Sequence, residues 1–223
     1  MANNFLTYKK FPTSEQASEL IGILNQHGIP FEMEDHSGHM PDIYVGQNFN
    51  NDIIVKIHPD DFLKVNSLLD EKAASLIDTV DKDYYLFSFN NDELIEVVSE
   101  PDKWCELDKQ LAKHILNSKG IVVNKELEDA LYKKRIKELS VEEKGSAIWT
   151  TVGYISAFLG GILGIAIGLN LWTSKRTLPN GSRVFIYTEK DRKHGQYITL
   201  IGTVMLCYWF YLQMKYSFFY RIF

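Results

Sequence analysis

Two long apolar runs near the C-terminus constrain the fold of this 223-residue chain most strongly. The first, residues 146–172, contains no ionisable side chain in 27 residues. As a helix it would cover roughly 40 Å, more than the roughly 30 Å hydrocarbon core of a bilayer. The second, residues 197–212, is uncharged and has tyrosines at both ends, as is typical of a membrane interface. These runs predict a two-helix transmembrane hairpin with spans at about 147–172 and 196–214. The alternative is a pair of buried helices, but core helices rarely run so long without a polar face.

Charge is distributed unevenly along the chain. Residues 1–108 carry 21 acidic and 7 basic side chains, a net charge of −14. Residues 109–145 carry 6 acidic and 9 basic side chains, and residues 146–223 carry 2 and 8. An acidic N-terminal part repels nucleic acid, whereas the basic segment before the first apolar run would be attracted to anionic lipid. We therefore expect the lipid bilayer, and no nucleic acid, as a partner.

The orientation in the membrane depends on two signals. The flanks outside the two spans carry seven basic residues and the loop between the spans carries six, so the positive-inside rule barely decides. The first 16 residues have no apolar signal-peptide core, and a large N-terminal part is not translocated readily without one. We therefore expect a multi-pass protein with both termini in the cytoplasm and the connecting loop outside. A loop on the cytoplasmic side would invert this topology.

The first 76 residues have the pattern of a small α/β domain. Thr13 and Gln16 form a capping-box pattern before a helical face of Ala17, Leu20, Ile21 and Leu24. Extended segments are predicted at 5–11, 30–34 and 53–58, and a second helix is predicted to start at Pro59. The order strand, helix, strand, strand, helix predicts an α+β fold of the ferredoxin-like, split βαβ type.

Two stretches in this domain resemble a known family. NFLTYKKFPTSEQASELIGILNQHGIPFEMED and IIVKIHPDDFLKVNSLL are similar to a bacterial domain family described as a putative signal-transducing protein of unknown function. That family is related to small nitrogen-regulatory trimer proteins, so the resemblance implies a ferredoxin-like fold and a role in signalling. The second helix departs from the family pattern at Val65 and Asn66. The membrane-anchored arrangement is also similar to proteins of Bacteroidetes-type bacteria, which implies the inner membrane.

Residues 77–145 are predicted to form a helical neck. Asn90 or Asn91 is suited to cap the helix DELIEVVSE, and Pro101 ends it. A second helix aligns Trp104, Leu107, Leu111, Ile115 and Leu116 along one stripe. The aromatic cluster at 84–89 is interpreted as an edge strand, an interaction surface or, most simply, a segment docked on a neighbouring core.

The best candidate site in the sequence is the loop over residues 34–52. The members proposed to contact a ligand or protein partner are Asp35, His36, His39, Asp42 and Tyr44. His36 and His39 with nearby carboxylates offer the nitrogen and oxygen donors that bind zinc, nickel or copper. Three alternatives stay open: a metal site, a ligand or partner loop, and an unspecialised loop.

Catalytic and cofactor motifs are absent from the sequence. It contains no phosphate-binding glycine loop, no HExxH and no nucleophile elbow, so we expect neither an enzyme nor a cofactor. Within the first apolar run, Gly160, Gly164 and Gly168 repeat every four residues, a spacing that lets helices approach closely in lipid. Their partner would be the second span, through Gly202, or another copy of the chain in a homo-oligomer.

These observations together predict a membrane-anchored signalling or adaptor protein. Its domains are a ferredoxin-like α/β domain at 1–76, a helical neck at 77–145 and a transmembrane hairpin at 146–223. The α/β domain would bind a ligand or a protein partner in the cytoplasm. The alternatives are a structural subunit of a larger membrane complex and a metal-dependent sensor that uses the 34–52 loop.

Overall fold

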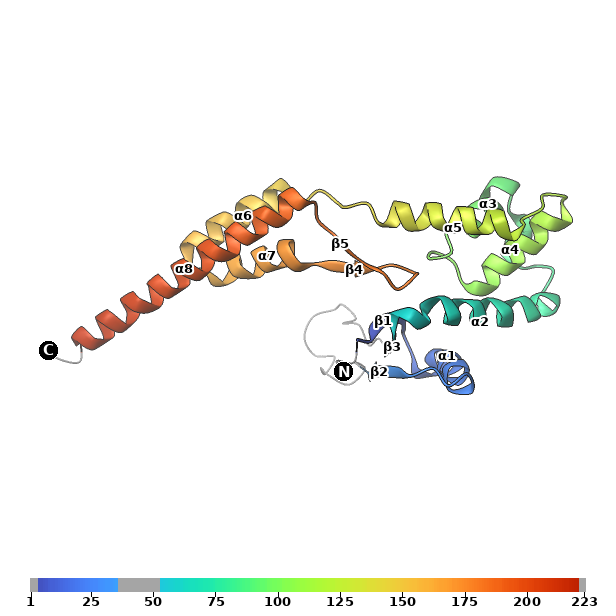
Figure 1. The fold of residues 1–223 in the computed structure, drawn as a ribbon, viewed down its shortest axis with the longest axis horizontal. Coiled ribbons are helices and arrows are strands. Elements are labelled where there is room, and N and C mark those ends of the chain that lie inside the picture. Colours follow the sequence, from blue (N-terminus) through green and yellow to red (C-terminus); the bar gives the residue numbers. More distant parts are fainter. Residues whose placement is uncertain (1–3, 36–52, 221–223) are drawn as a thin grey trace. The chain divides into compact units, whose positions relative to one another are not determined.

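The computed structural model describes residues 4–35 and 53–220, and it divides the chain into two compact units. Unit 1 comprises residues 1–140 together with the short segment 177–182. Unit 2 comprises residues 141–176 and 183–223. The chain thus leaves unit 1 after Ser140, returns to it at Thr177 and leaves it again after Ser182. Figure 1 shows the elements of both units.

The first half of unit 1 is a three-stranded antiparallel sheet with two helices. Its elements are β1 (Leu6–Phe11), α1 (Ser14–Gln26), β2 (Phe31–Asp35), β3 (Ile53–Ile57), the 3₁₀ turn η1 (Pro59–Asp61) and α2 (Phe62–Ser75). The strand order is β1-β3-β2, and both outer strands run antiparallel to β3. The predicted order of strands and helices is therefore confirmed, as is a mixed α+β fold.

Local sequence signals explain where these helices begin and what they bury. The Thr13 hydroxyl accepts a hydrogen bond of 3.4 Å from the Gln16 backbone N–H, so Thr13 is the predicted N-cap of α1. Apolar side chains of both helices pack on the sheet and form one core: Leu6, Ala17, Leu20, Leu24, Ile29, Ile53, Val55, Ile57, Phe62 and Val65. The predicted inner face of α1 is confirmed.

The second half of unit 1 is helical and has a core of its own. It contains two 3₁₀ turns, η2 (Ile77–Thr79) and η3 (Tyr85–Ser88), and three helices, α3 (Asn91–Ser99), α4 (Glu106–Ser118) and α5 (Lys125–Leu139). Asn90 caps α3 in a full capping box with Glu93, as one of the two predicted alternatives required. Its core contains Leu86, Leu94, Val97, Val98, Leu111, Ala112, Ile115, Leu116 and Val123.

The aromatic segment before α3 docks on this core. Leu86 is fully buried, and the rings of Phe89 and Trp104 meet edge to face with centroids 6.0 Å apart. The segment is a 3₁₀ turn and not an edge strand, because its side chains point into the helical core. The simplest of the three interpretations is the one that the structure supports.

Unit 2 consists of three helices. These are α6 (Ala147–Leu159), α7 (Ile162–Thr173) and the long α8 (Glu189–Tyr220). Between α7 and α8, the strands β4 (Lys175–Thr177) and β5 (Arg183–Phe185) form a two-stranded sheet around the Pro-Asn-Gly turn, as the sequence predicts. The α6 and α7 helices pack on each other and on the first part of α8, while the rest of α8 extends beyond them (Figure 1).

The first apolar run is not one continuous helix, which differs from the sequence prediction. Gly161 has φ +76°, a left-handed conformation that glycine adopts easily, and the chain turns back at this point. The resulting helices have 13 and 12 residues, fewer than a membrane crossing requires. Among the described residues one helix is long and apolar enough to cross a membrane, at Glu189–Lys215 with a mean hydropathy of 1.3. The predicted two-helix transmembrane hairpin is therefore not confirmed.

Candidate functional site

The loop proposed from the sequence lies mostly outside the described residues. This holds for His36, His39, Asp42 and Tyr44, whereas Asp35 is the last residue of β2. In the described parts of the chain, no group of three or more histidine, cysteine, aspartate or glutamate side chains is arranged to hold a metal ion. The loop hypothesis and its metal alternative therefore stay predictions.

A cavity of about 530 Å³ lies within unit 1 among α2, α4 and α5. The side chains that line it on α2 include Asn66, Asp70 and Ala74. Those on α4 and α5 include Glu106, Lys109, Lys113, Glu128 and Tyr132. Pro179, from the segment 177–182, also contributes to the wall. The cavity thus combines residues that are more than 100 positions apart in the sequence.

Lys109 is the central charge of this cavity. Only 14% of its side chain is exposed, and its ammonium lies 2.7 Å from Asp70 and 3.2 Å from Glu128. Lys113, one helical turn further along α4, also pairs with Glu128. Burial by itself would lower the pKa of Lys109, but the hydrogen bonds and charges of Asp70 and Glu128 raise it above the usual value. Lys109 is therefore a fixed cation that joins α2, α4 and α5.

One polar atom of the cavity wall has no protein partner within the described structure. The Tyr132 hydroxyl is buried and makes no hydrogen bond, and burial raises the pKa of this phenol. A buried hydroxyl without a partner costs stability, so its pairing with a polar group of a ligand would be favourable. The hydroxyl and the charged groups around Lys109 supply donors and acceptors for such a ligand.

The turn at 177–182 is held against α2 by specific contacts within unit 1. The Asn66 side-chain amide donates a hydrogen bond of 3.1 Å to the Pro179 carbonyl, and its oxygen accepts one of 2.6 Å from the Tyr8 hydroxyl. Leu178 is 3% exposed. Gly181 has φ +81°, and a Cβ there would lie 2.5 Å from the Pro59 carbonyl oxygen. These contacts keep the cavity wall contributed by Pro179 in place.

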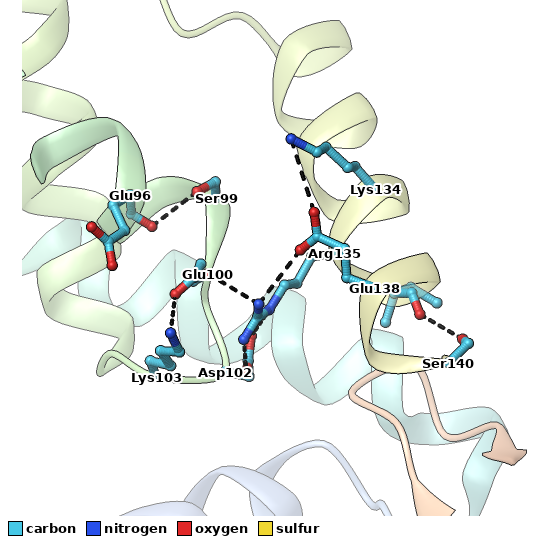
Figure 2. Close-up of polar contacts among 10 residues, drawn as sticks. Glu96, Ser99, Glu100, Asp102, Lys103, Lys134, Arg135, Glu138 and Ser140 are labelled. Carbon is cyan, nitrogen blue, oxygen red and sulfur yellow. Dashed lines mark hydrogen bonds and ion pairs between the residues drawn. The ribbon is translucent and has the colours of Figure 1, made fainter. Parts of the chain in front are cut away.

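Arg135 on α5 closes a polar cluster beside the cavity (Figure 2). Its guanidinium donates two hydrogen bonds of 2.7 Å to Asp102, which lines the cavity, and one of 3.0 Å to Glu100. Only 12% of the Arg135 side chain is exposed. The hydrogen bond and charge of Arg135 keep the pKa of Asp102 below its usual value. This bidentate pair ties α5 to the turn that follows α3.

The structure places the three glycines proposed for helix packing in different environments. A Cβ at Gly160 would meet no atom within 4 Å. A Cβ at Gly164 would lie 2.3 Å from the Cα of Ala157 on α6, and one at Gly168 would lie 2.8 Å from the Gly195 carbonyl oxygen on α8. Gly202 of α8 faces Gly161 and Ile165. The last two glycines of the series therefore pack within this chain.

Sequence reasoning missed the cavity. The i,i+4 spacing of Lys109 and Lys113 was the one local signal, because it places two cations on one helical face. Their carboxylate partners come from other helices, and local periodicity does not predict these. No protein-family model matches the chain, and neither the curated proteins nor the solved structures contain a match to it.

Proposed function

We propose that this chain is a membrane-anchored signalling or adaptor protein whose unit 1 binds a small polar ligand or a segment of a protein partner in the cytoplasm. Its cavity is the observation that carries the proposal. A volume of about 530 Å³ lies within the roughly 300–1,000 Å³ of ligand-binding pockets. Such pockets combine apolar walls with a few convergent polar groups, which here are Lys109, Glu128 and the unpaired Tyr132 hydroxyl.

The anchor of this proposed function is α8. Its 27-residue segment Glu189–Lys215 is about 40 Å long as a helix, and its best apolar stretch is only 11% buried within the protein. A helix with so much exposed apolar surface is stabilised by lipid. We place unit 1 on the cytoplasmic side of a bacterial inner membrane, in line with the resemblance to bacterial signalling domains.

The ferredoxin-like assignment of the α/β half is part of this proposal. The split arrangement, in which β3 lies between β1 and β2, supports it. The same fold occurs in the nitrogen-regulatory relatives that the sequence resembles. Fold similarity suggests a role in signalling but identifies no ligand.

The test fills the cavity without disturbing a core. Ala74 is exposed and lines the cavity, so Ala74→Trp would occupy the space. Ala130→Trp, an exposed position on α5 outside the cavity wall, is the matched control. Each full-length chain is purified in mild detergent, and retained small molecules and proteins are quantified by native and proteomic mass spectrometry.

We expect the wild type and Ala130→Trp to retain a common ligand or partner, and Ala74→Trp to lose at least ten-fold of it. Retention of nothing by the wild type, or equal retention by both variants, contradicts the proposal. Stoichiometric partners that ignore the cavity substitution would instead indicate a structural subunit of a membrane complex.

A further inference from the structure

We infer that α6 and α7 form a re-entrant hairpin, which enters the bilayer from the side of unit 1 and returns to that side, and that α8 alone crosses. This inference rests on the membrane anchoring proposed above. It changes the topology expected from the sequence, since the segment 174–188 would lie on the same side as unit 1. The residues after α8 would lie on the opposite side.

The three helix ends that this topology places together are joined by polar contacts within unit 2. Arg176, after α7, pairs with Glu143, before α6, at 2.8 Å. The Gly145 N–H donates a hydrogen bond of 2.9 Å to Asp191 in the first turn of α8. The Glu143 N–H bonds the Ile186 carbonyl at 2.7 Å. The start of α6, the end of α7 and the start of α8 therefore share one polar end.

The opposite end of the hairpin is apolar and reaches only part of the way along α8. A Cβ on Gly161 would lie 2.7 Å from the Gly202 carbonyl oxygen and 2.9 Å from the Leu206 side chain. Gly202 lies 13 residues after Glu189, about 20 Å along the helix axis, and α8 continues beyond it. The turn would thus lie near the middle of a hydrocarbon core of roughly 30 Å.

The turn itself has the chemistry that this depth requires. Non-helical backbone at membrane depth must have its polar groups paired. The N–H groups of Gly160 and Gly161 both bond the Ser156 carbonyl, and the Ile162 N–H bonds the Gly160 carbonyl. The flanking side chains are large, apolar and 65–72% exposed: Phe158, Leu159, Ile162 and Leu163. Such a tip would be unfavourable in water and favourable in lipid.

The division of the chain into units supports the same topology independently. Residues 141–176 leave unit 1 and end where the chain rejoins it at Thr177. Leu178 and Pro179 are packed within unit 1, so this turn lies on the membrane side where unit 1 lies. A segment that starts and ends in unit 1 returns to the side from which it came.

Single cysteines in the full-length chain test this topology. In a Cys105→Ser, Cys207→Ala background, which removes both free thiols, the probes are Lys82→Cys, Lys190→Cys and Lys215→Cys. All three lysines are exposed. They report on unit 1, the start of α8 and the end of its apolar segment. Sealed membrane vesicles of each orientation are treated with an impermeant maleimide, before and after permeabilisation.

We expect Lys82→Cys and Lys190→Cys to react in the same vesicles, and Lys215→Cys to react only in vesicles of the opposite orientation. If residue 190 reacts opposite both other probes, the two-span hairpin is correct and the inference is wrong. If all three react from one side, α8 does not cross and the inference is also wrong. Absence of the chain from the membrane fraction would contradict the proposed anchoring itself, while a negative ligand test would not affect the labelling.

Discussion

At the scale of single residues, buried charges in unit 1 are held by pairs of known geometry. Asp108 is 6% exposed and accepts hydrogen bonds of 2.8 Å from the Tyr84 hydroxyl and 3.0 Å from the Cys105 thiol. Burial, together with the Asp108 charge, raises the pKa of Tyr84 to about 12. Arg135 and Asp102 form the second such pair. Each pair joins segments that have no local reason to meet.

Arg135→Ala should lower the free energy of unfolding of unit 1 by about 2 kcal/mol, because it leaves two partly buried carboxylates without their donor. The measurement is urea unfolding of the full-length chain in mild detergent, followed by hydrogen exchange in α4 and α5. Lys134→Ala is the control, since Lys134 is 74% exposed and 3.9 Å from Glu138. It should change stability by less than about 0.5 kcal/mol. Equal effects of both substitutions would contradict this prediction.

The pH dependence of that difference provides an internal check. Arg135 lowers the pKa of Asp102 in the folded state, so the pair is fully stabilising above the unfolded value of about 3.9. The stabilisation is lost as the pH falls through the lowered folded-state pKa, because the unfolded state then binds the extra proton. The gap between wild type and Arg135→Ala should be constant near pH 7 and narrow below pH 4.

At the scale of elements, glycine decides how the three helices of unit 2 pack. Gly164 allows α7 to meet the backbone of α6 at Ala157, whereas Gly160 faces open space. These two glycines, both in the predicted four-residue repeat, therefore differ in what a side chain would encounter. Periodicity along one helix assigns residues to a face but does not identify the element that covers it.

Gly164→Ala should destabilise unit 2 by about 1–3 kcal/mol, because its methyl group overlaps the α6 backbone. Gly160→Ala is the matched control and should be nearly neutral. Intrinsic helix propensity favours alanine, so a loss at position 164 reflects the contact with α6. The readout is the midpoint of thermal aggregation in mild detergent. A neutral Gly164→Ala would show that α6 and α7 are not closely packed.

At the scale of the whole molecule, the chain divides its work between two units. Unit 1 contains the cavity and both polar pairs, and unit 2 contains the exposed apolar surface. Val204 on α8 is 59% exposed in the apolar segment, and Val122 in unit 1 is 71% exposed. The two valines have similar exposure, and our proposal places only Val204 in lipid.

Val204→Arg should therefore reduce the fraction of the chain that stays in membranes after an alkaline carbonate wash. An arginine near the centre of a membrane helix costs about 2.5–3.5 kcal/mol of insertion free energy. Val122→Arg should leave the membrane-bound fraction unchanged. Unchanged retention of both variants would show that α8 does not lie in the hydrocarbon core.

Much of the fold follows from the sequence because helix starts and buried faces are local properties. Thr13, Asn90 and the apolar spacing of α1 act within a few residues, so their patterns predict their structure. The Gly160–Gly161 pair was a usable breaker signal within an otherwise uniform apolar run. The apolar length of α8 likewise needs no tertiary information.

The tertiary structure alone decided where the chain returns and what its charges meet. The cavity exists because Asp70, Lys109 and Glu128 converge from three helices, and the turn at Pro179 joins them from more than 100 residues away. Two apolar stretches of equal hydropathy look alike in a sequence, whether they cross a membrane or fold back on a neighbouring helix. The sequence by itself therefore determined the apolar surface, and long-range packing through Gly161, Gly164 and Gly202 determined its shape, since those contacts depend on the backbone that each glycine meets.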